Sequence, residues 1–246
     1  MRDGGTMAAF LENLKPFMGN GKENEDGLSL EKYLEGYDPY RWETPSVTTD
    51  IIVYKYDGSL YNIDNGLKLL MVKRKNHPCI GEMALPGGFV NIREDVHQAA
   101  KRELFEETGL TDLPIEQIRT WGDADRDPRS RIITVAYMAL LDSESAKKVV
   151  AGDDAEEAFF VNVSLKLRGR REQNGKVIEF YEVNLTNVEH NVNIHGSVEH
   201  RYNSTGYLRE DKYEVMSTKG IAFDHARFIV QSLLLLKERI KLNHYK

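Results

Sequence analysis

Three glutamates with helical spacing dominate the chemistry that this sequence could perform. Glu103, Glu106 and Glu107 occupy positions i, i+3 and i+4 of one segment. In an α-helix, these positions fall within an arc of roughly 100°. Three carboxylates on such an arc repel one another unless a cation lies among them, and Mg²⁺ and Mn²⁺ prefer oxygen ligands of this kind. The spacing therefore predicts a divalent-metal site, with a solvated acidic surface as the alternative.

The position of the glutamates relative to the apolar face of the helix favours metal binding. The apolar stripe of the helix predicted at about 93–108 consists of Val96, Ala100 and Leu104. On the same helical wheel, Glu107 falls within this stripe and Glu103 lies beside it. A carboxylate at the edge of a core is costly unless it is paired or bound to a metal. A solvated acidic face would instead lie opposite the stripe.

The residues around these acids fit the same interpretation. Residues 85–88 (LPGG) allow a tight backbone path, along which the carbonyls of Gly87 or Gly88 can approach an ion without obstruction by side chains. Arg102 stands next to Glu103 and can pair with one of the acids to hold it in place. The alternative for Arg102 is a surface salt bridge that contributes little to stability.

The segment at 88–110 resembles a complete Nudix box. The positions that carry the resemblance are Gly88, Glu94, Arg102, Glu103, Leu104, Glu106, Glu107, Gly109 and Leu110. The resemblance implies a fold of the α/β (α+β) class, an α/β/α sandwich with a mixed sheet. It also implies hydrolysis of a nucleoside diphosphate linked to another moiety, with Arg102 and the three glutamates in the catalytic set. Mg²⁺ or Mn²⁺ is expected to bind through Glu103 and Glu107, assisted by Glu106 and a carbonyl of Gly87 or Gly88.

Segments outside the box narrow the expected substrate. Residues 45–50, 122–140, 152–160 and 222–226 are similar to one Nudix branch, which comprises ADP-ribose pyrophosphatases and ADP-ribose-sensing Nudix regulators of NAD metabolism. This similarity implies cleavage of ADP-ribose to AMP and ribose 5-phosphate. The regulators carry a winged-helix DNA-binding domain after the last helix, and the few residues that follow the last helix here favour an enzyme. A non-catalytic sensor of ADP-ribose and a Nudix hydrolase of another nucleotide are the alternatives.

Candidate substrate contacts follow from the same segments. The candidates are Arg126, Arg129, Arg131 and His225. Arginines beside a metal site can hold phosphate or ribose oxygens bidentately. Alternatively, they pair with Asp123, Asp125 and Asp127 and stabilise the loop, and His225 caps and packs the last helix. Glu156 or Glu157 could approach the metals as a general base, but the sequence does not place their loop.

The elements that must position these residues can be read from the apolar pattern. Strands are predicted at 46–56, 67–74, 115–121, 131–141, 159–163 and 176–185, and helices at 28–36, 93–108 and 222–241. Residues 1–27 are expected to be a flexible N-terminal segment. Residues 28–246 are expected to form the Nudix domain, with a β-rich insertion of unknown role at about 164–220.

Composition restricts the partners. The 246 residues carry a formal net charge of −6, which argues against a non-specific nucleic-acid binder. The single cysteine, Cys79, is expected to be structural and fits a reducing compartment. The sequence has no apolar run long enough to span a bilayer and no apolar signal core, so a cytoplasmic protein without a membrane partner is expected. The resemblance further implies a homodimer that acts on a small nucleotide-sugar.

Overall fold

The computed structural model describes residues 9–58, 60–64, 66–143, 146, 149, 155–208 and 210–243, with only the backbone described at 155, 156 and 243. The chain divides into two compact units, residues 1–44 and 45–246. The first unit contains the short 3-10 helix η1 (Lys15–Phe17) and helix α1 (Leu30–Glu35), which agrees with the helix predicted at 28–36. The domain division at residues 27 and 28 stays a prediction, and the flexibility predicted for 1–27 falls partly outside the described residues.

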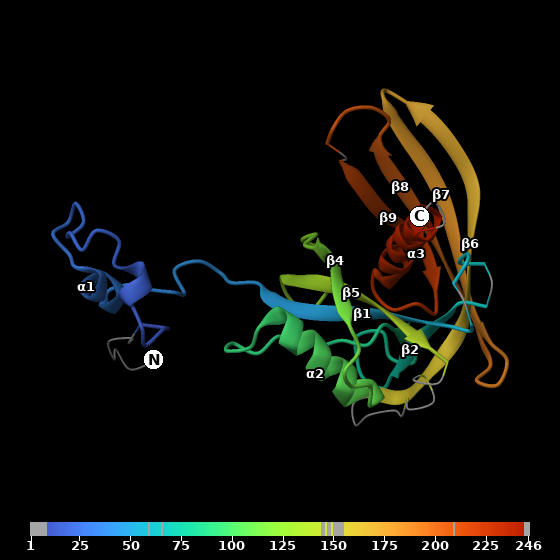
Figure 1. Cartoon of the computed structure of the whole chain (residues 1–246), viewed down its shortest axis with the longest axis horizontal. Helices are drawn as coiled ribbons and strands as arrows, with labels where there is room; N and C mark the ends of the chain where they lie inside the picture. The colour runs from blue at the N-terminus through green and yellow to red at the C-terminus, as the bar shows by residue number, and fades with distance from the viewer. Residues whose placement is uncertain are drawn as a thin grey trace. The chain divides into compact units, whose positions relative to one another are not determined.

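In the second unit, nine described strands form one mixed sheet that carries two helices (Figure 1). The strands are β1 (Ser46–Tyr56), β2 (Lys68–Arg74), β3 (Met83–Ala84), β4 (Ile115–Trp121), β5 (Ile132–Asp142), β6 (Ala155–Gln173), β7 (Lys176–Asn187), β8 (Val192–Asn203) and β9 (Asp211–Lys219). The helices are α2 (Val96–Thr108) and α3 (His225–Asn243). The strand order is β4-β5-β1-β2-β6-β7-β8-β9, with β3 paired to β2. Among the pairings of these strands, β1 with β5 is parallel and the others are antiparallel.

Strand β1 is buried on both faces because a helix covers each side of the sheet. Successive side chains of a strand point to opposite faces. Ile51 and Val53 accordingly join Leu104 of α2 in one hydrophobic core, whereas Ile52 and Tyr54 join the larger core beneath α3. The hydroxyl of Tyr54 lies 2.7 Å from Oγ of Ser232 on α3, which satisfies its polar end inside the core. This arrangement confirms the predicted sandwich of helices and mixed sheet.

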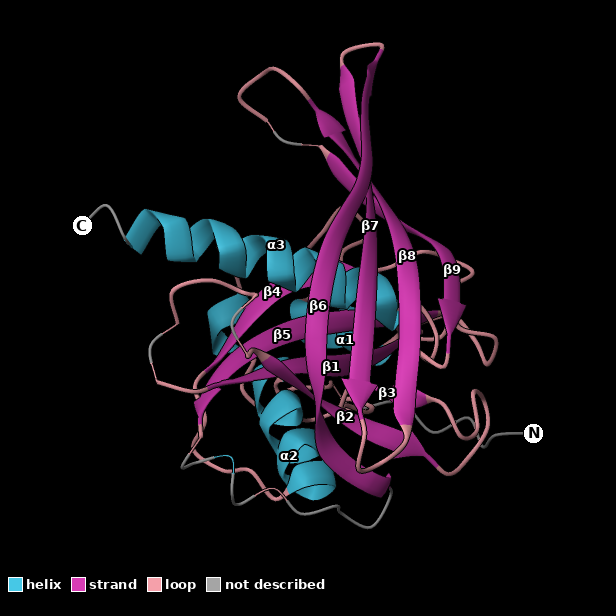
Figure 2. Ribbon diagram, turned by 90° about the vertical axis from the view of Figure 1, so that its right-hand side faces the viewer, coloured by secondary structure: helices cyan, strands magenta, loops and turns pink. Residues whose placement is uncertain are grey.

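The β-rich segment predicted at 164–220 continues the main sheet. Strand β6 runs well past the predicted end at residue 163, and β7, β8 and β9 extend the sheet beyond it, with α3 lying across them (Figure 2). The sequence prediction found one strand in this region, β7, and missed β8 and β9. Strands β8 and β9 are largely polar because one of their faces is open to solvent. On the other face of this part of the sheet, Val183 of β7, Val198 of β8 and Tyr213 of β9 lie in the core shared with α3.

Helix α2 has well-defined ends. The side chain of Asp95 accepts a hydrogen bond from the backbone N–H of His97 at 2.8 Å, so the helix begins at Val96, three residues later than predicted. Gly109 follows the helix with a φ of 71°, a left-handed conformation that suits glycine. No helix within the described ranges is long and apolar enough to cross a membrane.

One ion-pair cluster joins β9 to β4 and predicts a pH dependence of stability. Nη1 of Arg119 lies 2.6 Å from Oδ1 of Asp211, and Nε2 of His200 lies 3.7 Å from its Oδ2. The nearby His200 and Arg119 lower the pKa of Asp211 to about 2, although burial opposes this shift. A depressed carboxyl pKa stabilises the fold above the unfolded value of about 3.9, and this contribution is lost as the pH falls through 2.

We therefore expect the contribution of Asp211 to the free energy of unfolding, measured by urea denaturation, to fall by about 2 kcal/mol between pH 5 and pH 2. In Asp211→Asn, this part of the acid-dependent loss should be absent, although the variant starts from a lower stability at pH 7. Equal slopes of unfolding free energy against pH in the two proteins would show that Asp211 is not stabilised as a charged group.

Candidate active site

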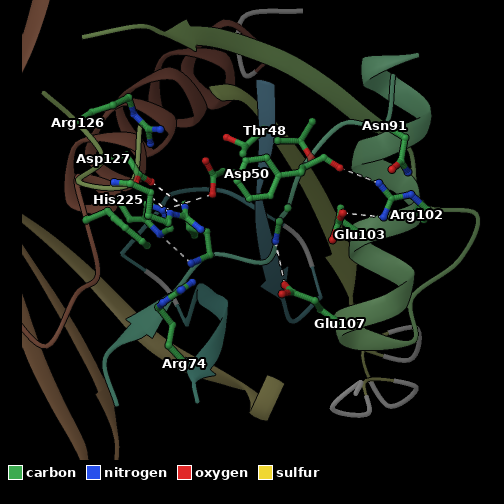
Figure 3. A pocket seen from close by; sticks show the side chains of 17 residues that line it. Thr48, Asp50, Arg74, Asn91, Arg102, Glu103, Glu107, Arg126, Asp127 and His225 are labelled. Carbon is green, nitrogen blue, oxygen red and sulfur yellow. Dashed lines mark hydrogen bonds and ion pairs between the residues drawn. The ribbon is translucent and has the colours of Figure 1, made fainter. Parts of the chain in front are cut away.

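A cleft of about 360 Å³ brings most of the predicted site residues together (Figure 3). It lies among α2, the loop at 85–88, the first half of β1, the loop at 122–131 and the start of α3. The predicted residues that line it are Gly87, Gly88, Arg102, Glu103, Glu107, Arg126, Arg129 and His225. Glu106 and Arg131 are not among the residues that line this cleft. The carboxylates of α2 lie on one side, and Arg126 and His225 lie on the other.

Arg102 organises the acidic side of the cleft. Its guanidinium donates to Oε1 of Glu94 at 2.8 Å, to Oε1 of Glu103 at 2.6 Å and to Oε2 of Glu106 at 2.9 Å. It also donates to the backbone carbonyl of Phe89 at 2.9 Å, which ties the preceding loop to the helix. The hydrogen bonds from Arg102 lower the pKa of Glu94 to about 2. Arg102 therefore holds three carboxylates, more than the single pairing expected from the sequence.

Glu107 is a largely desolvated carboxyl group. One of its oxygens accepts a hydrogen bond from the backbone N–H of Gly87 at 2.9 Å. Burial raises the pKa of Glu107 to about 8, against the lowering effect of that hydrogen bond. A cation close to this group would favour its charged form and reverse the shift. Its position within the apolar stripe, inferred from the helical wheel, agrees with this burial.

The glycine at position 88 leaves space for the carboxylate of Glu103. A Cβ atom placed on Gly88 would lie 2.4 Å from the carboxylate of Glu103, closer than real contacts allow. The side chain of Glu103 is 14% exposed, and burial raises its pKa. The partly buried carboxyls of Glu103 and Glu107, next to the Gly87-Gly88 backbone, are hard oxygen donors that suit Mg²⁺ or Mn²⁺.

The carboxylates do not converge into a ready-made ligand cluster. Within the described part of the chain, no three Asp, Glu, His or Cys side chains lie together closely enough to hold a metal ion. Glu103 and Glu106 turn instead toward Arg102, and Glu107 turns toward the N–H of Gly87. The donor types fit a divalent metal, whereas the ligand set named from the sequence stays a prediction.

The arginines of the 122–131 loop are held by partners within the protein. Arg126 donates to both carboxylate oxygens of Asp224, at 2.8 and 3.0 Å. Arg129 pairs in the same bidentate way with Asp127, at 2.8 and 3.0 Å. Arg131 donates to two backbone carbonyls of its own loop. Of the pairs named in the loop-stabilising alternative, the structure has the one between Arg129 and Asp127, whereas Arg126 pairs with Asp224 and Arg131 with backbone carbonyls. Arg126 and Arg129 also line the cleft, and their role in substrate binding stays a prediction.

His225 links the last helix to the glycine loop. Its Nδ1 accepts a hydrogen bond from the backbone N–H of Leu85 at 3.0 Å, and its Nε2 lies 3.3 Å from Oδ1 of Asp50. Since Nδ1 is an acceptor, the proton of the neutral ring belongs on Nε2, where it points to Asp50. Burial lowers the pKa of His225, which favours this neutral form. The packing interpretation of His225 fits this geometry.

Several residues of the cleft escaped the sequence analysis. Asp50 is buried in β1, where Oγ1 of Thr134 donates to its Oδ2 at 2.6 Å. Asp50 directly precedes the apolar run at 51–54 in a predicted strand, and a carboxylate at this position could have drawn attention to it. The guanidinium of Arg74 lies 5.0 Å from the ring centre of Phe223, and nothing in the sequence around either residue indicates this contact.

Neither glutamate proposed as a general base, Glu156 or Glu157, is among the described residues that line this cleft. The side chain of Glu156 is not described. A carboxylate oxygen of Glu157 lies 3.3 Å from Nδ1 of His190, and Glu157 is not among the residues that line the cleft. A catalytic role for either glutamate stays a prediction.

Comparison with known proteins agrees with this fold. Residues 57–181 match the NUDIX domain, and the chain belongs to this family. It is 39% identical over 144 residues to the ADP-ribose pyrophosphatase of Methanocaldococcus jannaschii, a match that covers 58% of this chain and 76% of that protein.

Two further proteins are similar to this chain. The chain is 31% identical over 142 residues to the "ADPR responsive transcriptional repressor NtrR" of Acinetobacter baylyi. This match covers 56% of the chain and 54% of the repressor, so the chain spans about half of the repressor's length. The crystal structure of a MutT/nudix family protein from Enterococcus faecalis superposes with a TM-score of 0.55 at 29% identity, covering 82% of this chain and 67% of that one.

Proposed function

We propose that this protein hydrolyses the diphosphate of ADP-ribose, with Mg²⁺ or Mn²⁺, to give AMP and ribose 5-phosphate. The observation that supports this most directly is the opposition of charges across the cleft. Glu103 and Glu107 lie on one side, where they could hold metal ions, and the cationic group of Arg126 lies on the other. Arg129, which pairs with Asp127, also lines the cleft. The similarity to the M. jannaschii ADP-ribose pyrophosphatase favours ADP-ribose as the substrate.

The roles of the side chains follow from their contacts. Divalent ions held by Glu103, Glu107 and Glu106 would neutralise the diphosphate oxygens and lower the pKa of a bound water. Arg102 keeps Glu103 oriented through the 2.6 Å hydrogen bond. Arg129 stacks on the rings of Phe89 and Phe223, at 5.3 and 5.7 Å, which limits its motion beside the position expected for a phosphate.

The overall reaction is balanced without a further reactant. The oxygen of one water molecule forms a bond to one phosphorus atom, and the bond from that phosphorus to the bridging oxygen breaks. The two protons of the water are distributed between the new phosphate groups and solvent. Charge neutralisation and positioning account for most of the catalysis in reactions at phosphorus.

The proposal is tested by incubating the purified protein with ADP-ribose and measuring AMP by chromatography. We expect metal-dependent release of AMP and ribose 5-phosphate in equal amounts with Mg²⁺ or Mn²⁺, and none after chelation by EDTA. A damaged deoxynucleoside triphosphate and a dinucleoside polyphosphate serve as comparison substrates. A kcat/KM for either of these above that for ADP-ribose would contradict the substrate assignment.

A non-catalytic sensor of ADP-ribose is the second candidate. It is favoured by the similarity to the A. baylyi repressor and by the engagement of both Glu103 and Glu106 with Arg102. Calorimetry with ADP-ribose separates the two functions. Binding without turnover at saturating metal would favour the sensor, whereas metal-dependent turnover would favour the hydrolase.

A further inference from the structure

A second cavity, of about 540 Å³, adjoins the proposed active site. The two cavities share Arg126 and Phe223 in their walls, so they meet at the side of the cleft that faces the glutamates of α2. The second cavity is lined by the loop at 123–128, by the start of α3 and by residues 212–215 of β9. Strand β9 belongs to the β-rich extension of the sheet, which consists of β6 beyond residue 163 together with β7, β8 and β9.

A chain of ion pairs holds one side of the second cavity. Asp224 accepts from Arg126 at 2.8 Å and from Arg227 at 2.5 Å. Arg227 in turn lies 2.7 Å from Oδ2 of Asp123, on the opposite loop. The side chains of Arg126, Arg227 and Asp224 are 5%, 8% and 13% exposed. Because these groups are mostly buried and mutually paired, this side of the second cavity is organised before any ligand binds.

The second cavity combines apolar surfaces with hydrogen-bond acceptors. Tyr213, Val215 and Phe223 contribute apolar and aromatic surface, while Asp125 contributes an exposed carboxylate. Apolar walls suit the faces of a purine, and carboxylates accept hydrogen bonds from an exocyclic amine or from ribose hydroxyls. The volume falls in the range typical of cavities that bind small molecules.

ADP-ribose carries adenosine on one side of its diphosphate and ribose on the other. Its binding site therefore needs room for a nucleoside on one side of the reacting phosphorus and for a sugar on the other. The cleft of about 360 Å³ contains the proposed metal ligands and the arginines, and the adjoining cavity offers further space next to Arg126. We propose that this second cavity binds the nucleoside half of the substrate, and that β9 thereby makes the β-rich extension a determinant of specificity. This inference rests on the proposed hydrolysis of ADP-ribose, but it is testable without turnover.

The test uses AMP and ribose 5-phosphate as separate probes in calorimetry with the full-length protein. Val215→Trp should fill the second cavity and weaken AMP binding by about tenfold or more, with ribose 5-phosphate binding unchanged. Met216→Trp is the matched control, because Met216 is the next residue on β9, is exposed and is not among the residues lining this cavity. It should bind both probes like the wild type.

A second variant keeps the proposal testable if Val215→Trp does not fold, as judged by thermal unfolding. Asp125→Ala removes an exposed carboxylate from the cavity and should weaken AMP binding roughly three- to tenfold, the effect of one lost hydrogen bond. Unchanged AMP binding in the folded variants, or absence of AMP binding by the wild type, would overturn the nucleoside assignment. A selective loss of ribose 5-phosphate binding would overturn it as well.

The test of the nucleoside site and the test of ADP-ribose hydrolysis can fail independently. If the wild type binds AMP and Val215→Trp loses it while ADP-ribose is never cleaved, the nucleoside site stands and the hydrolase proposal fails. If ADP-ribose is cleaved and Val215→Trp binds AMP normally, the hydrolase proposal stands and the nucleoside site fails.

Discussion

Replacing Glu107 with glutamine is expected to lower kcat for ADP-ribose by about 10³-fold or more at saturating Mg²⁺, equivalent to roughly 4 kcal/mol. The substitution removes one anionic oxygen from the proposed metal ligands and changes the shape of the side chain very little. The amide oxygen can still accept the N–H of Gly87, which lies 2.9 Å from the native carboxylate. The fold should therefore be retained, and circular dichroism and thermal unfolding would check this directly.

The burial of Glu107 sharpens this expectation. Because its pKa is raised to about 8, a neutral amide is tolerated at this position without the desolvation cost of a charge. The free energy of unfolding in the absence of metal should then be equal to or greater than that of the wild type. Glu182→Gln is the control: Glu182 pairs with Arg168 on the β-rich extension and should keep full turnover when exchanged. Near-normal kcat in Glu107→Gln would remove Glu107 from the metal ligands.

Gly87→Ala is expected to destabilise the fold strongly, because the added methyl group would collide with the backbone of a neighbouring strand. A Cβ atom at position 87 would lie 2.0 Å from the carbonyl oxygen of Thr49 and 2.9 Å from Cα of Asp50. Both contacts are with the backbone of the central strand β1, which cannot move without disturbing its pairing with β5. We expect a loss of about 3 kcal/mol or more in the free energy of unfolding, measured by urea denaturation.

The same substitution should also lower turnover, because the loop at 85–88 places the N–H of Gly87 against Glu107. Gly169→Ala provides the matched control, since its added methyl group would meet only a ring atom of Phe180 at 3.6 Å, an ordinary contact. That variant should retain both stability and activity. Wild-type stability and turnover in Gly87→Ala would show that the close approach of the two backbones is not required.

Local sequence patterns predicted the elements that depend on short-range effects. The strand predicted at 46–56 has the bounds of β1, and the strand predicted at 115–121 has those of β4. Runs of β-branched and aromatic residues favour strands wherever they are buried. The position of Glu107 within the apolar stripe likewise followed from helical periodicity alone, because neighbours on one turn are determined by the 3.6-residue repeat. The predicted class of site and the family resemblance rest mainly on this helix and on the residues that flank it.

Long-range packing decided the rest of the site. His225 contacts the backbone of Leu85 across 140 positions of sequence, and Arg126 pairs with Asp224 across 98. No local pattern encodes such contacts, because they arise only when α3 packs onto the sheet next to the glycine loop. The sequence likewise could not tell that Arg129 would line the cleft while Arg131 would bond to its own loop.

Local sequence patterns also failed to predict most of the β-rich extension. The segments that form β8 and β9 are too polar to predict strands by themselves, and they become strands through pairing with β7 and burial of one face beneath α3. The sequence alone thus determined the acidic helix, the central strands and the chemistry of the carboxylates, since these depend on residue type and short spacing. The tertiary structure alone decided which arginines line the cleft with those carboxylates and placed β9 in the wall of the second cavity, because both depend on contacts between distant segments.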